Sequence, residues 1–409
     1  MSADSIKHFS KLSPLKISSN EHECISLYVH VPYCLQKCHY CDFVKFGVDE
    51  LPPIEDYFKL LLGELKHLEL KKTQKIKTLY FGGGTPSLAP TSELEKIIAY
   101  VSRFFIEAPE ITLEINPGTL TLQDFLDLKS IGINRFSIGV QSFNDDFLKA
   151  CGRKHSSKDS FKDLELMDKL DLNYSMDLLF GLPHQTLDDL EKDLNLTVKF
   201  QPKHVSPYNL TLPNGHFFNK NRATDEKQTD MMNLIADRIA EFGCYKYEIS
   251  NFAQKGFESQ HNLGYWEDRT YYGLGMGAHS YDKDMGEWGV RYWNPGTYSK
   301  YEQLVDSKNT KHRTTEVLKL HESLTDFCHT SLRQTKGLSK SMLLNKFQVK
   351  NLPNSLWNEL SGLEKRGLIK YTDSNKTERW CLTSTGFEIP NEVFRHLCFL
   401  EKDMANERR

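Results

Sequence analysis

The chain has 409 residues, and at about 150 residues per domain this length favours two or three domains. Its 52 basic and 55 acidic residues give a formal net charge of −3, which argues against a protein that coats a polyanion such as nucleic acid. No apolar run approaches the ~18 residues of a membrane-spanning helix, so we expect no transmembrane segment. Residues 1–24 lack the apolar middle of a secretion signal and are expected to form a flexible tail. These features predict a cytoplasmic protein, or a mitochondrial one in a eukaryote.

Short apolar runs alternate with amphipathic stretches between residues 25 and 212. Six runs predict strands: Leu27–Val31, Thr78–Phe81, Ile111–Ile115, Arg135–Val140, Tyr174–Phe180 and His204–Leu210. Apolar residues at helical spacing predict helices over Tyr57–Leu70, Glu93–Phe105, Leu122–Lys129, Ser160–Leu170 and Leu187–Phe200. Strand and helix alternating in this way predict a parallel α/β architecture, and six units favour a partial (β/α)6 TIM-like barrel. An open doubly wound sheet is the alternative.

Two further regions follow the alternating units. Residues 213–313 are rich in Gly, Tyr, Trp and Asn, with one helical stretch over Asp230–Phe242, and are expected to close or cap the barrel. Residues 314–409 begin with helical stripes, including Lys340–Phe347 and Leu356–Lys365, and continue with two β-like runs, Leu368–Tyr371 and Arg379–Leu382. Helices followed by a small hairpin predict a winged-helix-like domain. Its charge is mixed and it shows no basic recognition helix, so we expect it to cover the barrel mouth rather than to bind nucleic acid.

Three of the nine cysteines lie close together, in Cys34-Leu-Gln-Lys-Cys38-His-Tyr-Cys41, directly after the first predicted strand. Thiolates at this spacing hold a metal ion or an iron–sulfur cluster. A structural zinc site needs a fourth ligand, which His30 or His39 could supply. A [4Fe-4S] cluster on three cysteines would instead leave one iron open to a substrate. The other six cysteines are scattered and are expected to be ordinary small core residues.

Glycine or polar residues mark the ends of the following predicted strands. Gly82-Gly83-Gly84-Thr85-Pro86 follows the second strand, where consecutive glycines let backbone N–H groups approach a polar ligand. Glu114 ends the third strand, Gln141 ends the fourth, and Asp177 lies in the fifth. In a βα barrel the carboxyl ends of the strands carry the chemistry. Each feature alone is explained by a turn or a hydrogen-bonded core residue, but together they predict one ligand site.

The three-cysteine loop resembles that of the radical S-adenosylmethionine (SAM) superfamily. The resemblance implies a [4Fe-4S] cluster on Cys34, Cys38 and Cys41, with the amino and carboxylate groups of SAM on the open iron. In that superfamily an electron from the cluster cleaves SAM to methionine and a 5′-deoxyadenosyl radical. An electron donor is therefore implied as a partner.

Further motifs resemble the oxygen-independent coproporphyrinogen III oxidase family, from about Ser26 to the end of the chain. The motifs are Tyr28-Val29-His30-Val31-Pro32-Tyr33-Cys34, Phe81–Ser87, Asn134–Ser142, Gly152-Arg153-Lys154-His155 and Asp177–Pro183. Carried over by motif, the resemblance implies that SAM is lined by Tyr28, Tyr40, Gly83, Gly84, Thr85, Glu114, Gln141, Arg153 and Asp177. The planar fork of an arginine such as Arg153 suits this place because it can grip a carboxylate.

One departure from the oxidase pattern bears on function. The decarboxylating oxidases carry a further cysteine where this chain has Phe43, in Cys41-Asp42-Phe43. The Cys-Asp-Phe form resembles the HemW branch, the radical-SAM haem chaperones, and so does His261-Asn262-Leu263-Gly264-Tyr265-Trp266. That resemblance implies that haem is bound and passed to acceptor proteins.

The same resemblance places His261, Tyr265 and Trp266 near haem. An imidazole can ligate haem iron, and aromatic rings can stack on a porphyrin. His279 and His30 are weaker candidates for the ligand. Two other functions stay open: an oxygen-independent coproporphyrinogen III oxidase that makes protoporphyrinogen IX, and a zinc-stabilised binding module. The missing cysteine favours the chaperone over the oxidase.

Overall fold

The computed structural model describes residues 23–71, 73–307, 310–347, 352–374 and 377–405. The predicted tail over residues 1–24 lies outside the described residues, except for Glu23 and Cys24, which begin the first strand. Among the helices of the described ranges, none has the length and apolar character needed to cross a bilayer.

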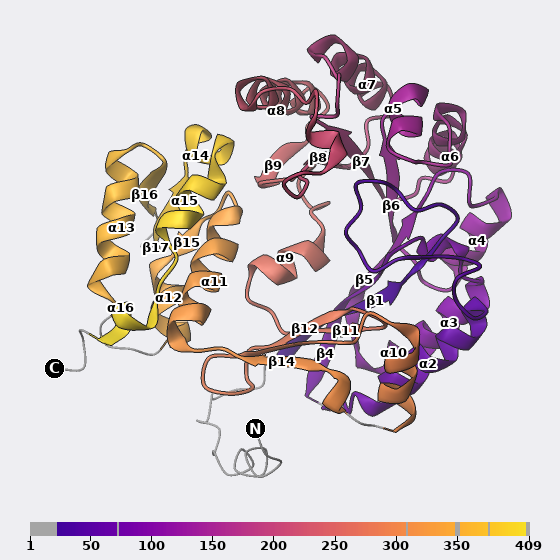
Figure 1. Cartoon of the computed structure of the whole chain (residues 1–409), viewed down its shortest axis with the longest axis horizontal. Coiled ribbons are helices and arrows are strands. Elements are labelled where there is room, and N and C mark those ends of the chain that lie inside the picture. The colour runs from indigo at the N-terminus through magenta and orange to yellow at the C-terminus, as the bar shows by residue number, and fades with distance from the viewer. Residues whose placement is uncertain (1–22, 72, 308–309, 348–351, 375–376, 406–409) are drawn as a thin grey trace.

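The centre of the molecule is one curved sheet. Within the described residues it has twelve strands, in the order β14-β13-β12-β11-β1-β4-β5-β6-β7-β8-β10-β9. Its parallel strands are β1 (Glu23–Val31), β4 (Gln74–Gly83), β5 (Phe105–Ile115), β6 (Arg135–Gln141), β7 (Tyr174–Phe180), β8 (His204–Asn209) and β11 (Tyr271–Leu274). The sheet bends around a central space (Figure 1), and its end strands do not pair with each other. The predicted partial TIM-like barrel is therefore confirmed, with β11 as an additional parallel strand.

Helices cover the outside of this sheet. They are α2 (Ile54–His67), α3 (Thr91–Val101), α4 (Leu122–Ser130), α5 (Asp145–Ala150), α6 (Ser157–Lys169) and α7 (Leu187–Phe200), with short 3₁₀ turns η2 (Pro86–Leu88) and η3 (Ser102–Phe104). The five predicted helices are present. The second ends at Val101 rather than at Phe105 because Ser102–Phe104 form the 3₁₀ turn η3 and β5 begins at Phe105. The six-residue α5 was not predicted, since it is too short to show a helical period.

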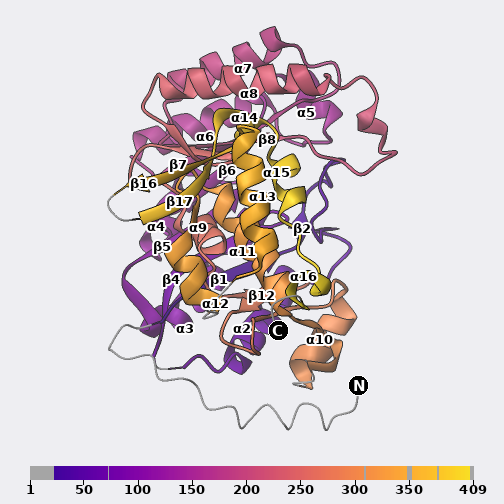
Figure 2. The ribbon, with the colours of Figure 1, turned by 90° about the vertical axis from the view of Figure 1, so that its left-hand side faces the viewer.

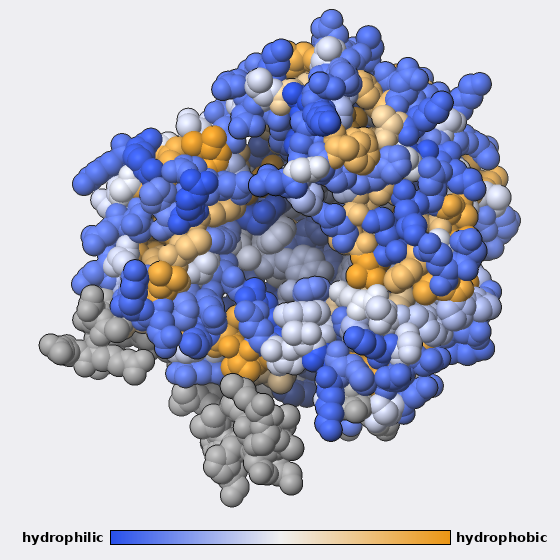
Figure 3. Space-filling model, in the orientation of Figure 1, coloured by the Kyte–Doolittle hydropathy of each residue, from blue (hydrophilic) through white to orange (hydrophobic). Residues whose placement is uncertain are grey.

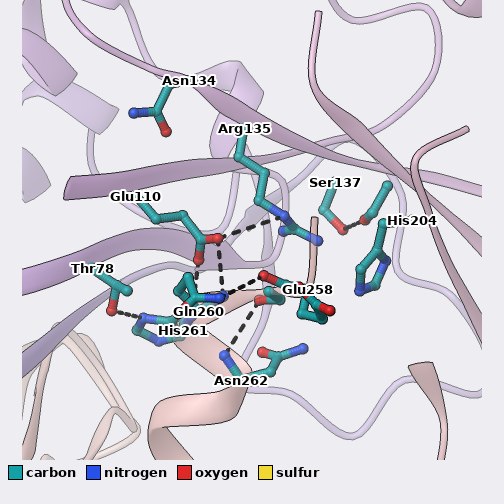
Figure 4. A network of polar contacts seen from close by, with 12 residues as sticks. Thr78, Glu110, Asn134, Arg135, Ser137, His204, Glu258, Gln260, His261 and Asn262 are labelled. Carbon is teal, nitrogen blue, oxygen red and sulfur yellow. Dashed lines mark hydrogen bonds and ion pairs between the residues drawn. The ribbon is translucent and has the colours of Figure 1, made fainter. Parts of the chain in front are cut away.

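Side chains alternate along the barrel strands between two different surroundings. On β6, Phe136, Ile138 and Val140 are buried in the large apolar core together with residues of the covering helices. Arg135 and Ser137, which alternate with these residues, point to the inside of the barrel, as Figure 4 shows. Successive strand residues face opposite sides of a sheet, so this alternation produces an apolar shell and a polar lumen.

The segment after β8 adds strands at both ends of the sheet. Its elements are η4 (Phe217–Asn219), α8 (Asp225–Ala240), β9 (Tyr245–Glu248), β10 (Asn251–Ala253), α9 (Gln260–Trp266), β12 (His279–Asp282), β13 (Val290–Trp293), α10 (Tyr298–Asp306), η5 (Thr310–His312) and β14 (Thr314–Val317). The prediction of a helix from residue 314 was wrong at its start. Residues 314–317 instead form β14, because the open edge of β13 offers them antiparallel hydrogen bonds.

Helix α9 lies in the middle of the barrel in Figure 1, between strands of its two ends. Glu110 of β5 holds its N-terminus: the two carboxylate oxygens accept the backbone N–H groups of Gln260 at 3.0 Å and of His261 at 2.9 Å. The first N–H groups of a helix have no partner within the helix, and a carboxylate also suits the positive end of the helix dipole. The helix thus fills the part of the lumen opposite the carboxyl ends of the strands.

The C-terminal elements form a second apolar core. They are α11 (Leu320–Arg333), β15 (Leu338–Ser339), α12 (Lys340–Phe347), α13 (Asn354–Lys365), β16 (Ile369–Ser374), β17 (Thr377–Leu382), α14 (Ser384–Glu388), α15 (Pro390–His396) and α16 (Glu401–Ala405). A small sheet in the order β15-β17-β16 packs against the helices. This arrangement confirms the predicted winged-helix-like architecture, which lies against one side of the barrel (Figure 2).

Polar contacts join these C-terminal elements to α9 and its neighbours. Arg333 donates to the buried Glu248 at 3.3 Å, and its guanidinium lies 4.4 Å from the ring centroid of Trp266. Gln334 donates to the Trp266 carbonyl at 2.9 Å, and Lys346 pairs with Asp268 at 2.6 Å. Figure 3 shows a hollow between the C-terminal elements and the barrel. The helix that carries the His-Asn-x-x-Tyr-Trp motif thus lies where the two parts of the chain meet.

A buried carboxylate fixes the barrel end formed by α2, β11 and α10. Glu64 is 3% exposed and accepts hydrogen bonds from the Gly275 N–H at 2.8 Å, Asn294 at 2.7 Å and Tyr301 at 2.9 Å. Its ion pair with Arg313 measures 2.8 Å. Removing one partner of a buried pair leaves the other uncompensated, which costs about 3–5 kcal/mol.

We therefore expect Glu64→Ala to lower the free energy of unfolding by about 3 kcal/mol, because four donors lose their acceptor. Urea denaturation monitored by circular dichroism measures this quantity. The matched control is Glu95→Ala on the exposed face of α3, which should change it by less than about 0.5 kcal/mol. Equal effects of the two substitutions would contradict the stabilising role assigned to Glu64.

Candidate functional site

The three clustered cysteines lie in a loop that is tied down at both ends. Its first part forms β2 (Tyr33–Cys34), which pairs with β3 (Phe46–Gly47). Its middle is anchored by a hydrogen bond from the His39 N–H to the Cys151 carbonyl at 3.0 Å. All three thiols line a cavity of about 430 Å³ at the carboxyl ends of the barrel strands. The loop therefore presents the thiols to the end of the barrel that carries the chemistry in βα folds.

The environment of the thiols disfavours isolated thiolates. Burial, with smaller contributions from the neighbouring Cys38 and Cys41, raises the pKa of the Cys34 thiol to about 11. Burial also raises the pKa of Cys41. Ligand thiols must lose their protons when a metal binds. Within the described residues, no three Cys, His, Asp or Glu side chains converge on a single ion position.

The glycine turn after β4 brings the chain close to the cysteine loop. Gly83 has a φ of +114°, and a Cβ atom there would lie 2.5 Å from the His30 ring. A Cβ atom on Gly84 would lie 2.7 Å from the Tyr33 carbonyl oxygen. Only glycine permits both this backbone conformation and this close approach. Gly83, Gly84 and Thr85 consequently line the same cavity as the three thiols.

Two partly buried carboxylates face the cavity from β5 and β7, the strands on either side of β6. Glu114 accepts hydrogen bonds from the Tyr80 hydroxyl at 2.8 Å and from the Gly83 N–H at 3.0 Å. Burial raises its pKa to about 7, although these two hydrogen bonds oppose the rise. Asp177 accepts a hydrogen bond from Ser137 at 2.9 Å, and burial raises its pKa to about 6. Carboxylates in such surroundings are ready to accept hydrogen bonds from a ligand that carries hydroxyl or ammonium groups.

Arg153 stands on the cysteine side of the cavity. Its guanidinium donates to Asn116 and to the Gly139 carbonyl, both at 2.8 Å, and lies 3.7 Å from the Cys38 sulfur. Gln141 ends β6 with a φ of +65°, a conformation that is uncommon for residues other than glycine and often marks functional sites. Both side chains line the cavity.

Most of the residues assigned to SAM by resemblance meet at this cavity. Those lining it are Tyr40, Gly83, Gly84, Thr85, Glu114, Gln141, Arg153 and Asp177, together with Cys34, Cys38 and Cys41. The structure does not bring Tyr28 into this lining. Its hydroxyl instead lies 3.0 Å from His30 Nδ1, and its ring packs near Tyr80.

Several residues of the lining were not predicted from the sequence. They are Lys45, Tyr80, Asn116, Ser137, Tyr208 and Asn209. The two-residue period of the strands carried a signal for most of them. Ser137 lies four residues before Gln141, and Asn116 lies two residues after Glu114. Because residues an even number apart share one face of a strand, both side chains are expected on the face that points into the barrel.

The residues assigned to haem lie elsewhere, on α9. His261 is 2% exposed, and both ring nitrogens make contacts: Nδ1 lies 2.8 Å from the Thr78 hydroxyl and Nε2 lies 2.9 Å from the Tyr265 hydroxyl. Burial lowers the pKa of His261 to about 3, so the imidazole is neutral. Its ring stacks on Tyr80 with centroids 4.8 Å apart. Ligation of haem iron by His261 would require one of the two hydrogen bonds to be given up.

The remaining residues considered in the sequence as ligands, His30, His39 and His279, each contact different neighbours. His30 Nε2 lies 2.6 Å from the Val44 carbonyl, and His39 Nδ1 lies 3.0 Å from the Ala150 carbonyl. His279 stacks on Trp293 with centroids 5.2 Å apart. Phe43, which stands where the oxidases have a further cysteine, is 66% exposed and lines the cavity.

The raised pKa of Glu114 makes stability depend on pH. A carboxyl group whose pKa is higher in the folded state than in the unfolded state favours folding when protonated, so this group costs stability as pH rises from about 4.5 through about 7. We expect Glu114→Gln to stabilise the cluster-free protein at pH 8 by about 2 kcal/mol, and by much less at pH 5. Urea denaturation at both pH values measures the difference. A loss of stability at pH 8 would contradict the assigned burial cost.

Comparisons with known proteins agree with this geometry. Residues 28–197 match the Radical SAM superfamily. The chain is 35% identical to "Heme chaperone HemW" of Bacillus subtilis over 381 residues, covering 90% of this chain and 98% of that one. It is 33% identical to the protein of the same name from Lactococcus lactis over 379 residues, covering 90% and 96%.

A solved structure shows the same fold. It is coproporphyrinogen III oxidase (HemN) from Escherichia coli, described as a radical SAM enzyme, with a TM-score of 0.75 and 20% identity. The likeness covers 93% of this chain and 91% of that one. With the sequence relatives at 33–35% identity over nearly their whole lengths, this chain belongs to the HemW heme chaperone family of the Radical SAM superfamily.

Proposed function

We propose that this chain binds haem and passes it to acceptor proteins, and that it holds a [4Fe-4S] cluster on Cys34, Cys38 and Cys41 with SAM on the open iron. The observation that carries the cofactor part is the shared cavity, which joins the three thiols to the glycine turn and to two partly buried carboxylates. Membership of the family supports the haem part. An electron donor and one or more haem acceptors are the partners that this function needs.

Different residues of the cavity would contact different parts of SAM. Gly83 and Gly84 bring the backbone against the ligand, and Arg153 offers its guanidinium beside the cluster cysteines. Glu114 and Asp177 accept hydrogen bonds from the ammonium group or the ribose hydroxyls of SAM. When bound and reduced, the cluster supplies an electron that can cleave SAM. The chain itself orients SAM and limits its contact with water.

Phe43 stands where the oxidases carry a further cysteine, and this difference supports the chaperone function over the oxidase function. We expect that reconstituted, reduced protein given SAM and coproporphyrinogen III under anaerobic conditions forms no protoporphyrin. After oxidation of the mixture, liquid chromatography with fluorescence detection measures both porphyrins. Transfer of haem from the loaded protein to apomyoglobin, followed by absorbance, should proceed in the same preparation.

The cluster ligands are tested alongside. The reconstituted wild type should contain about four iron atoms per chain. Cys38→Ser should lose most of this iron and of the acid-labile sulfide. The matched control Cys398→Ser replaces an exposed cysteine of the C-terminal elements and should keep both. If protoporphyrin accumulates over many turnovers and disappears in Cys38→Ser, the oxidase is the correct function and the chaperone proposal fails.

We also propose that His261, with Tyr265 and Trp266, meets haem. Because Tyr265 occupies Nε2 of His261 in the structure, Tyr265→Phe should leave this nitrogen free and strengthen haem binding. His261→Ala should weaken it about tenfold or more and remove the Soret shift that imidazole ligation produces. Absorbance titration with haem measures both effects.

The matched control for the haem titration is His67→Ala, an exposed histidine at the end of α2. It should leave the affinity and the spectrum unchanged. Wild-type affinity and spectrum in His261→Ala would show that the ligand lies elsewhere. Circular dichroism on each variant separates loss of haem binding from loss of the fold, since His261 is buried inside the barrel.

A further inference from the structure

A buried cation lies inside the barrel, below the proposed SAM cavity. Arg135, the first residue of β6, is 3% exposed, and its side chain projects into the lumen (Figure 4). Within the described part of the chain, its one ion pair joins Nε to Glu110 Oε2 at 4.0 Å, and its guanidinium makes no hydrogen bond. Arginine has five N–H donors and keeps its charge in proteins. This guanidinium is therefore a charge whose hydrogen-bonding capacity the fold does not use.

Glu110, the carboxylate paired with Arg135, already accepts other hydrogen bonds. Both oxygens of Glu110 already accept the N-terminal amides of α9. A contact of 4.0 Å between Arg135 and Glu110 is longer than a hydrogen bond. The positive charge of Arg135 therefore stays available to other acidic groups of the lumen.

The two cavity carboxylates are those groups. Arg135, Ser137 and Gly139 follow one another on the inner face of β6, and Ser137 donates to Asp177 at 2.9 Å. In the strand register, Ser137 lies beside Glu114 of β5 and beside Ser175 of β7. Glu114 and Asp177 therefore flank the row of β6 that Arg135 begins. Charges in a lumen shielded from water interact more strongly than charges on the surface.

We infer that Arg135 is a positioning residue of the SAM site: its guanidinium is the counter-charge that keeps the carboxylates of Asp177 and Glu114 ionised, and so able to accept hydrogen bonds from SAM. This inference rests on the proposed SAM site and adds a residue that does not line it. Arg135 acts through the two carboxylates rather than by touching SAM.

The pKa values agree with this role. Burial raises the pKa of both Asp177 and Glu114, and Arg135 lowers both. The other groups that face Arg135 are Glu110 of β5, Tyr80 of β4, His204 of β8, Tyr247 of β9 and His261 of α9. Burial lowers the pKa of His204 and His261, so these imidazoles are neutral, and burial raises the pKa of the tyrosines. Among these groups Arg135 is the cation and Glu110 opposes it.

The test is the pH dependence of SAM binding to the anaerobically reconstituted holoprotein, measured by calorimetry and by the change that SAM causes in the electron paramagnetic resonance of the reduced cluster. For the wild type, affinity should fall as pH drops through about 7 and then about 6, because Glu114 and then Asp177 become protonated. Arg135→Gln should move this fall up by about one pH unit, which weakens binding at pH 7 about tenfold and restores it near pH 9. Arg135→Lys, which keeps the charge, should move it less.

A second variant should shift the pH dependence of SAM binding in the opposite direction. Glu110→Gln removes the negative charge that opposes Arg135, so the fall should move to lower pH. The matched control is Arg103→Gln, an exposed arginine that packs on Tyr100 outside the barrel, and it should leave the profile unchanged. Iron content and thermal melting are measured for every variant.

The outcomes separate this inference from the function on which it rests. Absence of SAM binding to the wild type at every pH would overturn the proposed SAM site and, with it, the role of Arg135. Binding to the wild type with the same pH profile in Arg135→Gln would overturn the inference alone. A uniform loss of affinity at all pH values in both Arg135→Gln and Glu110→Gln would assign both residues a purely structural role and would also overturn it.

Discussion

The alternation of polar and apolar side chains along the barrel strands is the constraint on which the rest of the structure depends. Residues such as Phe136 and Ile138 face the helices and form the main core. The residues between them, such as Arg135 and Ser137, line a polar lumen. A shift of one residue in the strand register would exchange the two faces. The same pattern that drives the shell to fold therefore also places the chemistry inside.

A polar lumen is costly unless its groups are paired, and helix α9 provides part of that pairing. Glu110 accepts two amides of the helix, and Thr78 and Tyr265 contact the ring nitrogens of His261. Buried polar groups without partners cost about 1–3 kcal/mol each. The helix with the His-Asn-x-x-Tyr-Trp motif thus serves the fold as well as any ligand.

Tyr80 connects the proposed SAM cavity to this helix. Its hydroxyl donates to Glu114 at 2.8 Å, and its ring stacks on His261. On the other side of α9, Trp266 contacts Arg333, the last residue of the C-terminal helix α11, and Gln334, which follows it. The proposed SAM cavity, the proposed haem residues and the C-terminal elements are consequently joined by direct contacts.

The sequence by itself determined the strands, the cysteine loop and most of the cavity. Periods of two and about 3.6 residues revealed the elements, and parallel strands bring their carboxyl ends to one edge, which explains why Glu114, Gln141 and Asp177 meet. The tertiary structure alone decided what depends on distant segments. Residues 314–317 became a strand because β13 was there to pair with them. His261 proved to be buried because α9 returns into the barrel about 150 residues after Glu110. No local period encodes a contact of that separation.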